Sequence, residues 1–272
     1  MNAGKVDRGN PVRILQLTDF HFLPESGEKM LEVDTELSFS EVSEAAQSSG
    51  PPPDLAVLTG DLVQTPGVPV YRRLKARLQK LPFPCYCLPG NHDDPALIEA
   101  ILAGGNLHSE SRVVLDVWQI ILLNSVVPGR PHGRLSGQQL ERMAAFLDAH
   151  PERFALIALH HHPVPCGSRW MDTMMVENAG DLFGVLKTRR QTRGIIFGHV
   201  HQAMDILYRG LRVLGAPSTC FQFKPNQAKL ALDSIPPGFR RIELYRDGSI
   251  KTTVERLGEL PLDPEGAVSG SC

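Results

Sequence analysis

Short apolar runs alternate with amphipathic segments along most of the chain, and this alternation constrains the fold more than any other feature. The runs that we interpret as strands are 12–17, 55–58, 84–88, 113–123 with a turn near Asp116, 154–159 and 194–197. The segments that we interpret as helices are 36–47, 70–79, 95–102, 137–149 with Ser136 as its N-cap, and 178–187. Strands that alternate with helices in this way predict an α/β protein.

The pattern changes after Gly198, where strands follow one another without helices between them. These strands are 205–208, 211–214, 220–223, 240–245 and 249–254. Arg209-Gly210 and Asp247-Gly248 are typical hairpin turns, so the second half adds antiparallel strands. We expect one domain over 12–257, an N-terminal tail over 1–11 and a flexible C-terminal tail over 258–272, which is rich in Pro, Gly and Ser.

Composition excludes several classes of protein. With 42% hydrophobic and 21% charged residues, the chain of 272 residues is ordinary for a soluble globular protein. The formal net charge of −2 and the lack of a basic stripe argue against a nucleic-acid partner. The polar N-terminal residues and the shortness of the apolar runs predict neither a secretory signal nor a membrane partner.

The five cysteines predict a reducing, cytoplasmic location. Their number is odd and their spacings are irregular, which disfavours a disulfide framework. Cys85 and Cys87 are interpreted as residues on one face of a strand, because the second pair of a structural zinc site is missing from the sequence.

Five of the predicted strands end in clusters of Asp, Asn or His. Each cluster alone has an ordinary interpretation, since Asp and Asn often form turns and a single His is more often a surface or core residue. The clusters begin at Asp19, Asp61, Asn91, His160 and His199. In open α/β sheets the ligand site lies at the carboxyl ends of strands, so these five clusters are predicted to converge on one crevice.

The composition of the clusters indicates a metal site. Asp19 and His21 lie two residues apart, as do His199 and His201, which would place each pair on one face of extended chain. Asp61 and Asn91 each follow a glycine, where the backbone can approach an ion closely. These donors are oxygen and nitrogen atoms without a thiolate, a set that suits Mn, Fe, Zn or Co.

These motifs resemble a known superfamily. DFH, GD, GNHD, HHHP and GHVH, in this order, are similar to the pattern of calcineurin-like metallophosphoesterases. The longer segments ILQLTDFH, LTGDL, LPGNHD, ALHHHPVPCGSRWMD, FGHVHQ and APSTCFQFKP look like the bacterial class III cyclic-nucleotide phosphodiesterases, in the cyclic AMP branch. The resemblance runs over about 12–257 and implies a four-layer α/β/β/α sandwich of two mixed sheets flanked by helices.

The resemblance also implies a role for each Asp, Asn and His residue of these motifs. One metal ion is expected on Asp19, His21 and His201, and the other on Asn91, His160 and His199, with Asp61 as the bridge. The residues expected to face the substrate are His21, Asp61, Asn91, His92 and His201. His161 is the alternative to His160 as ligand, and His162 is taken as a supporting residue. Fe or Mn is the expected pair, with Zn or Co as alternatives.

The implied reaction is hydrolysis of 3′,5′-cyclic AMP to 5′-AMP, which would lower the cellular level of cyclic AMP. Two divalent ions whose charge is only partly offset by Asp19 and Asp61 can hold a bridging hydroxide and a phosphodiester for in-line attack. An alkoxide leaves poorly, so His92 is expected to protonate the 3′-oxygen as general acid, with Asp93 as its orienting partner.

Weaker candidates lie outside the metal motifs. They are His132, Trp170, Phe221, Phe223 and Lys224, for which a loop, core or solvated position is the ordinary interpretation. The basic run over 71–80 is interpreted as the charged outer face of an amphipathic helix.

Three other functions compete with cyclic AMP hydrolysis. A broader phosphodiesterase would share the metal site and act on 2′,3′-cyclic nucleotides, glycerophosphodiesters or nucleotide pyrophosphates. A metal-free scaffold of the same fold is disfavoured because none of the seven ligand positions is missing. A DNA-repair nuclease would need capping and coiled-coil segments for which the chain has no room. Cyclic GMP as substrate, the metal pair and the oligomeric state stay open at this point.

Overall fold

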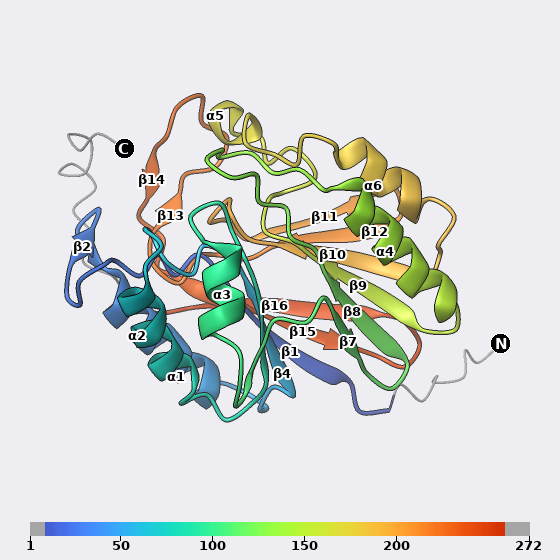
Figure 1. Cartoon of the computed structure of the whole chain (residues 1–272), viewed down its shortest axis with the longest axis horizontal. Helices are drawn as coiled ribbons and strands as arrows, with labels where there is room; N and C mark the ends of the chain where they lie inside the picture. The colour runs from blue at the N-terminus through green and yellow to red at the C-terminus, as the bar shows by residue number, and fades with distance from the viewer. Residues whose placement is uncertain (1–8, 259–272) are drawn as a thin grey trace.

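Two six-stranded sheets lie face to face in the computed structural model, which describes residues 9–258 (Figure 1). The first sheet has the order β16 (Ile250–Arg256), β15 (Gly238–Leu244), β1 (Val12–Leu17), β4 (Leu55–Thr59), β5 (Cys85–Leu88) and β6 (Leu107–His108). The second has the order β11 (Met204–Tyr208), β12 (Leu211–Gly215), β10 (Thr192–Phe197), β9 (Phe154–Ala158), β8 (Trp118–Leu122) and β7 (Arg112–Val114). Both sheets are mixed. In the first, the antiparallel pairs lie at one edge, where β15 joins β1 and β16, and the strands from β1 to β6 are parallel. In the second, an antiparallel strand lies at each edge of a parallel centre.

Alternation of side chains along the central strands builds the core between the sheets. Ile14 and Val57 of the first sheet are buried in one cluster with Leu156 and Ile196 of the second. Their neighbours in sequence point to the opposite face of each sheet, as the period of two in a strand requires. Apolar side chains are therefore needed on both faces of these strands, which explains why they are continuous apolar runs.

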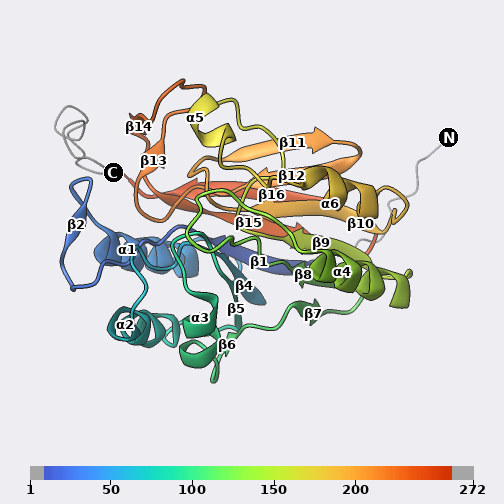
Figure 2. The same cartoon turned by 45° about the horizontal axis from the view of Figure 1, so that its top comes forward.

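Helices cover the two outer faces and complete four layers (Figures 1 and 2). The first sheet packs against α1 (Thr35–Ser48), α2 (Val68–Leu78) and α3 (Pro95–Ile101). The second packs against α4 (Gly137–Ala149), α5 (Arg169–Asp172) and α6 (Ala179–Leu186). Ser136 caps α4 as predicted, since its hydroxyl accepts a hydrogen bond from the Gln139 amide at 3.2 Å. The α/β/β/α sandwich is confirmed.

The predicted strand 220–223 is partly wrong. Only β13 (Gln222–Phe223) is a strand, and it pairs with β14 (Leu232–Asp233). The Ser218 hydroxyl accepts a hydrogen bond from the Cys220 amide at 2.9 Å, and this local turn takes the chain out of extended pairing. The sequence also missed β14, β6, the short ribbon of β2 (Lys29–Met30) with β3 (Val33–Asp34), and helix α5.

The two predicted hairpins and the strand positions of Cys85 and Cys87 agree with the structure. The hairpins at Arg209-Gly210 and Asp247-Gly248 join β11 to β12 and β15 to β16. Cys85 and Cys87 are both buried in the core under the first layer of helices, and the four cysteines within 9–258 are free thiols. None of the helices in the described chain is long and apolar enough to cross a bilayer. The predicted tails, 1–11 and 258–272, lie almost wholly outside the described residues.

Candidate metal centre

The loops that follow five central strands meet at one end of the sandwich, and they bring the seven predicted ligands together. The ligand atoms of Asp19, His21 and His201 lie within 4.8 Å of one another. In the neighbouring group, Nε2 of His160 lies 3.1 Å from Oδ1 of Asn91 and 3.3 Å from Oδ2 of Asp61. The Asp61 carboxylate also lies 3.9 Å from Nε2 of His21, so it touches both groups.

Hydrogen bonds to carbonyl groups decide where the imidazole lone pairs point. Nδ1 of His160 donates to the Thr59 carbonyl and Nδ1 of His201 donates to the Phe221 carbonyl, each at 2.8 Å. Because a carbonyl only accepts, both neutral rings carry their proton on Nδ1 and leave a lone pair on Nε2. Such anchoring of the outer nitrogen is typical of metal-binding histidines.

Lone pairs therefore face one another across the centre. Nε2 of His201 lies 3.2 Å from Nε2 of His21, whose Nδ1 bonds to Oε1 of Gln64 at 2.8 Å. Nε2 of His201 also lies 3.4 Å from the Asp19 carboxylate. Nitrogen and carboxylate lone pairs at this separation repel unless a cation or a proton lies between them. The donor set thus fits divalent metal ions.

His199 strengthens this conclusion. Its side chain is buried, and among residues 9–258 its Nε2 has no hydrogen-bond partner. Its backbone amide donates to both oxygens of the Asp19 carboxylate at 3.1 Å, which places the two segments side by side. A buried nitrogen without a partner is costly, and metal binding would remove that cost.

Unusual backbone conformations distinguish the ligand positions. Asp19, His21, Asp61, His199 and His201 all have positive φ values between 49° and 68°. Non-glycine residues rarely adopt this region, and such strain gathers at functional sites. The sequence predicted that the pairs Asp19/His21 and His199/His201 would each share one face of extended chain. This prediction is wrong, because the backbone is not extended at these residues. They converge because each ligand lies in a left-handed turn.

Glycines allow the backbone of neighbouring loops to approach. A Cβ on Gly90 would lie 2.2 Å from Oδ1 and 2.4 Å from the amide nitrogen of Asp61. A Cβ on Gly198 would lie 2.1 Å from the Thr18 hydroxyl and 2.9 Å from the Asp19 carboxylate. The GD, GN and GH dipeptides of the sequence thus reflect close packing of one loop on the next.

Gly90→Ala is expected to displace Asp61 and to destabilise the fold. The overlap involves backbone as well as side chain, and overpacking of this kind costs about 1–3 kcal/mol. The measurement is thermal unfolding together with metal content after loading with Mn. Gly137→Ala is the control, because a Cβ there meets nothing within 4 Å. If both variants unfold and bind metal alike, the close packing has no consequence.

The titration behaviour follows from the same packing. Burial raises the pKa of Asp61, but the imidazoles of His160, His92 and His21 outweigh burial and hold it well below the usual range. Burial lowers the pKa of His160, yet the Asp61 and Asp19 carboxylates bring it to about 9. The centre thus attracts positive charge strongly.

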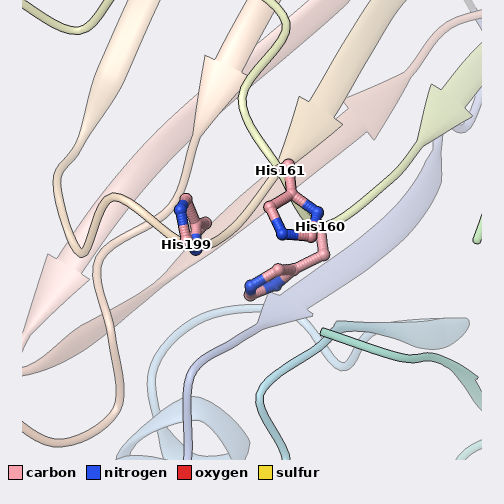
Figure 3. A group of neighbouring side chains, drawn as sticks. All are labelled: His160, His161 and His199. Carbon is pink, nitrogen blue, oxygen red and sulfur yellow. The ribbon is translucent and has the colours of Figure 1, made fainter. Parts of the chain in front are cut away.

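His160 and His161 differ in what they face (Figure 3). The two rings are nearly perpendicular, at 84°, and both lie close to the His199 ring, with centroids 5.0 and 4.8 Å away. His161 shares a hydrogen bond with the Ser125 hydroxyl at 2.8 Å through its Nδ1, and its ring packs on Gly133. Only His160 of the pair is in contact with Asp61 and Asn91. His161 nevertheless shares a group with His160 and His199 whose ligand atoms lie within 4.8 Å of one another, and among residues 9–258 its Nε2 has no hydrogen-bond partner.

Asp93 does not orient the His92 ring, which corrects the sequence interpretation. Its buried carboxylate accepts hydrogen bonds from the backbone amides of Leu62 and Gly90 and from the Tyr71 hydroxyl. These hydrogen bonds engage the carboxylate and tie the two loops together. Nδ1 of His92 instead contacts the Gln64 carbonyl at 3.2 Å, and the His92 amide donates to Oδ1 of Asp61 at 2.9 Å.

The weaker candidates lie around the centre. Phe223 stacks on His201 with ring centroids 4.4 Å apart, and Trp170 meets Phe223 edge-on at 5.0 Å. Lys224 is exposed, and His132 lines a separate cavity of about 430 Å³. Gln64 and Tyr71 were missed by the sequence analysis. Gln64 follows the GD motif by three residues and could have been noticed as a polar residue in an apolar loop, whereas Tyr71 carried no signal.

Comparison with known proteins agrees with this geometry. The sequence model of the family described as Calcineurin-like phosphoesterase matches residues 12–203. The 3′,5′-cyclic adenosine monophosphate phosphodiesterase CpdA of Escherichia coli (strain K12) is 41% identical over 260 residues, covering 95% of this chain and 94% of the relative. The CpdA protein of Vibrio vulnificus (strain CMCP6) is 38% identical and covers 96% of both chains.

The fold is also found among solved structures. A dimetal phosphatase from Danio rerio superposes with a TM-score of 0.59 at 15% identity, covering 92% of this chain and 100% of that one. The family implies divalent metal ions, and the groups of histidine and aspartate described above are suited to bind them. This chain belongs to the calcineurin-like phosphoesterase family and, within it, to the group that contains the bacterial 3′,5′-cyclic nucleotide phosphodiesterases.

Proposed function

We propose that this protein hydrolyses 3′,5′-cyclic AMP to 5′-AMP with the help of two divalent metal ions, and so lowers the level of cyclic AMP in the cytoplasm. The observation that carries the proposal is the convergence of imidazole and carboxylate lone pairs in two adjacent groups that share Asp61. The relatives named as cyclic AMP phosphodiesterases, similar over nearly the full chain, support the choice of substrate.

Each ion has its own set of residues in this proposal. Asp19, His21 and His201 would hold the first ion. The second would be held by Asn91, His160 and His199, with Asp61 between the two. The oxygen and nitrogen donors suit Fe or Mn best, and Zn or Co are alternatives. When bound, the ions supply an acidified water and positive charge against the phosphoryl oxygens.

His92 is proposed to donate the proton to the leaving 3′-oxygen. The Gln64 carbonyl at 3.2 Å keeps a proton on Nδ1, so Nε2 is the nitrogen that can carry the transferable proton. The amide of His92 donates to Asp61, the carboxylate that would lie between the ions, so this residue is held next to the proposed pair. His21 packs edge-on against the His92 ring with centroids 5.1 Å apart.

A cavity beside His92 has a size that suits a small substrate. It has a volume of about 460 Å³, and besides Asn91 and His92 it is lined by Gln64, Val126 and Pro128. Cavities of this size take single small molecules. The formal net charge of −2 gives no attraction to a long polyanion. We therefore favour a single cyclic nucleotide over DNA or RNA.

The proposal is tested by turnover of metal-loaded protein on a panel of diesters. We expect kcat/KM for 3′,5′-cyclic AMP to exceed the values for 2′,3′-cyclic AMP, glycerophosphocholine and a dinucleotide pyrophosphate by about tenfold or more, with 5′-AMP as the product. Equal rates across the panel would support a phosphodiesterase of broader range. Inclusion of 3′,5′-cyclic GMP decides whether the base is recognised.

A further inference from the structure

A second group of metal-binding side chains lies outside the centre described above. Its members are His162, Cys166 and Asp172, whose ligand atoms all lie within 4.8 Å of one another. His162 follows β9, Cys166 comes from the succeeding loop, and Asp172 ends α5. None of the three is used in the proposed reaction.

Both ring nitrogens of His162 are buried without a hydrogen-bond partner among residues 9–258. The whole side chain is fully buried. Nε2 lies 3.5 Å from Oδ1 of Asp172, which is longer than an ordinary hydrogen bond. A buried imidazole with both nitrogens unsatisfied is costly, and an ion or water that is part of the native structure is the usual explanation.

The spacing of His162 and Asp172 fits a tetrahedral ion. Zinc bonds of 2.0–2.1 Å to nitrogen and oxygen place such ligands about 3.4 Å apart at the tetrahedral angle, close to the 3.5 Å between His162 and Asp172. A bond of about 2.3 Å to sulfur places the thiolate about 3.6 Å from either one. The Cys166 sulfur lies within 4.8 Å of both other ligand atoms, so this distance is within its reach.

The Asp172 carboxylate is already held in position. Oδ1 accepts a hydrogen bond from the Cys166 amide at 2.7 Å, and Oδ2 accepts one from the Gly167 amide at 3.3 Å. Backbone donors of this kind orient a ligating carboxylate and leave its remaining lone pairs free. The loop that carries Cys166 is thus folded around the group before any ion binds.

We propose that His162, Cys166 and Asp172 bind a third divalent ion of the zinc type, separate from the pair at Asp61. The ion binds a neutral imidazole, a carboxylate and a thiolate, and the thiol proton passes to solvent when the ion binds. A fourth position is left for water. Because His162 stacks on His199 with centroids 5.6 Å apart, the ion would stiffen the loop between β9 and α5 beside the metal pair.

The sulfur ligand makes the third site selectively detectable. The pair at Asp61 has oxygen and nitrogen donors alone, so a thiolate-to-cobalt charge-transfer band can arise only where a cysteine binds the metal. Titration of metal-free full-length protein with Co(II) is expected to give this band and a stoichiometry of three. Mn(II), which prefers oxygen and nitrogen donors, is expected to stop at two.

Three variants test the assignment. Cys166→Ser is expected to lose the charge-transfer band and one Co(II), while still binding two Mn(II). His162→Gln should lose the same band, and Cys85→Ala, which removes a buried thiol from the core under the first helices, should keep it. Circular dichroism and Mn(II) stoichiometry report whether each variant is folded.

Two results would overturn the third site. One is a wild-type protein that binds two Co(II) without the band. The other is a folded Cys166→Ser that keeps the band. Failure of the proposed function is recognised separately, because the Mn(II) stoichiometry would then fall below two in the wild type while the sulfur band remained.

Discussion

Asp61→Asn is expected to lose both metal ions of the pair and to reduce turnover of cyclic AMP by at least about a hundredfold to a thousandfold, the scale on which loss of one preorganised electrostatic group acts. The Asp61 carboxylate lies 3.3 Å from Nε2 of His160 and 3.9 Å from Nε2 of His21, one from each group. Asparagine keeps the oxygen that accepts the His92 amide, so the loop should stay folded. Elemental analysis and turnover after loading with Mn are the measurements.

Asn91→Ala is the matched variant for Asp61→Asn. The amide oxygen of Asn91 contacts the imidazole of His160, which belongs to the second group. The Asn91→Ala variant should therefore lose mainly the second ion. A bridging role for Asp61 predicts a clear difference between the two variants. Equal metal retention in both would contradict that role.

His92→Ala is expected to keep both ions and to slow hydrolysis of cyclic AMP by about a hundredfold to ten-thousandfold, the range of general acid catalysis. The loss should depend on the leaving group, because a nitrophenolate departs without a proton whereas the ribose 3′-alkoxide does not. Bis-nitrophenyl phosphate should therefore be hydrolysed by the variant at a rate much closer to that of the wild type. Turnover of both substrates, with metal content checked, gives the comparison.

A different role for His92 gives a different result. If the ring only stabilises negative charge on the phosphoryl oxygens, both substrates lose rate by a similar factor. Similar losses would thus remove the proton-donor role and leave the metal pair intact.

The long, periodic elements could be predicted from the sequence because burial imposes their pattern. Helix α4 spans Gly137–Ala149, the range predicted from its amphipathic repeat and its Ser136 cap. Strand β1 spans Val12–Leu17, also as predicted, because both of its faces are covered. Two-residue strands such as β2 and β13 hold too few side chains to show a period.

The ligand residues proposed for the centre could also be predicted from the sequence, but the groups that orient their side chains could not. Asp19, Asp61 and His201 were chosen by residue type and by their place after apolar strands. The groups that orient them include the carbonyls of Thr59 and Phe221, which any residue could supply, so the sequence gives no sign of them. Asp and His adopt positive φ more often than most residues, but residue type alone does not say which of them do so in this chain.

Asp93 and Cys166 show that spacing in the sequence does not determine which side chains meet in space. Asp93 follows His92 directly, yet it turns to the Tyr71 hydroxyl and the Leu62 amide, which come from other parts of the chain. Cys166 lies between His162 and Asp172 in the sequence, at a spacing that matches no common metal motif. The fold alone brings these three together.

Diffraction from crystals grown with Mn(II), at an X-ray energy just above the manganese absorption edge, tests the metal pair most directly. Anomalous scattering locates each ion without reference to the protein ligands. We predict two peaks at the Asp61 carboxylate, one also contacted by Asp19, His21 and His201, and the other by Asn91, His160 and His199. A single peak, or two peaks of which neither contacts Asp61, would contradict the two-metal site on which the proposed hydrolysis of cyclic AMP depends.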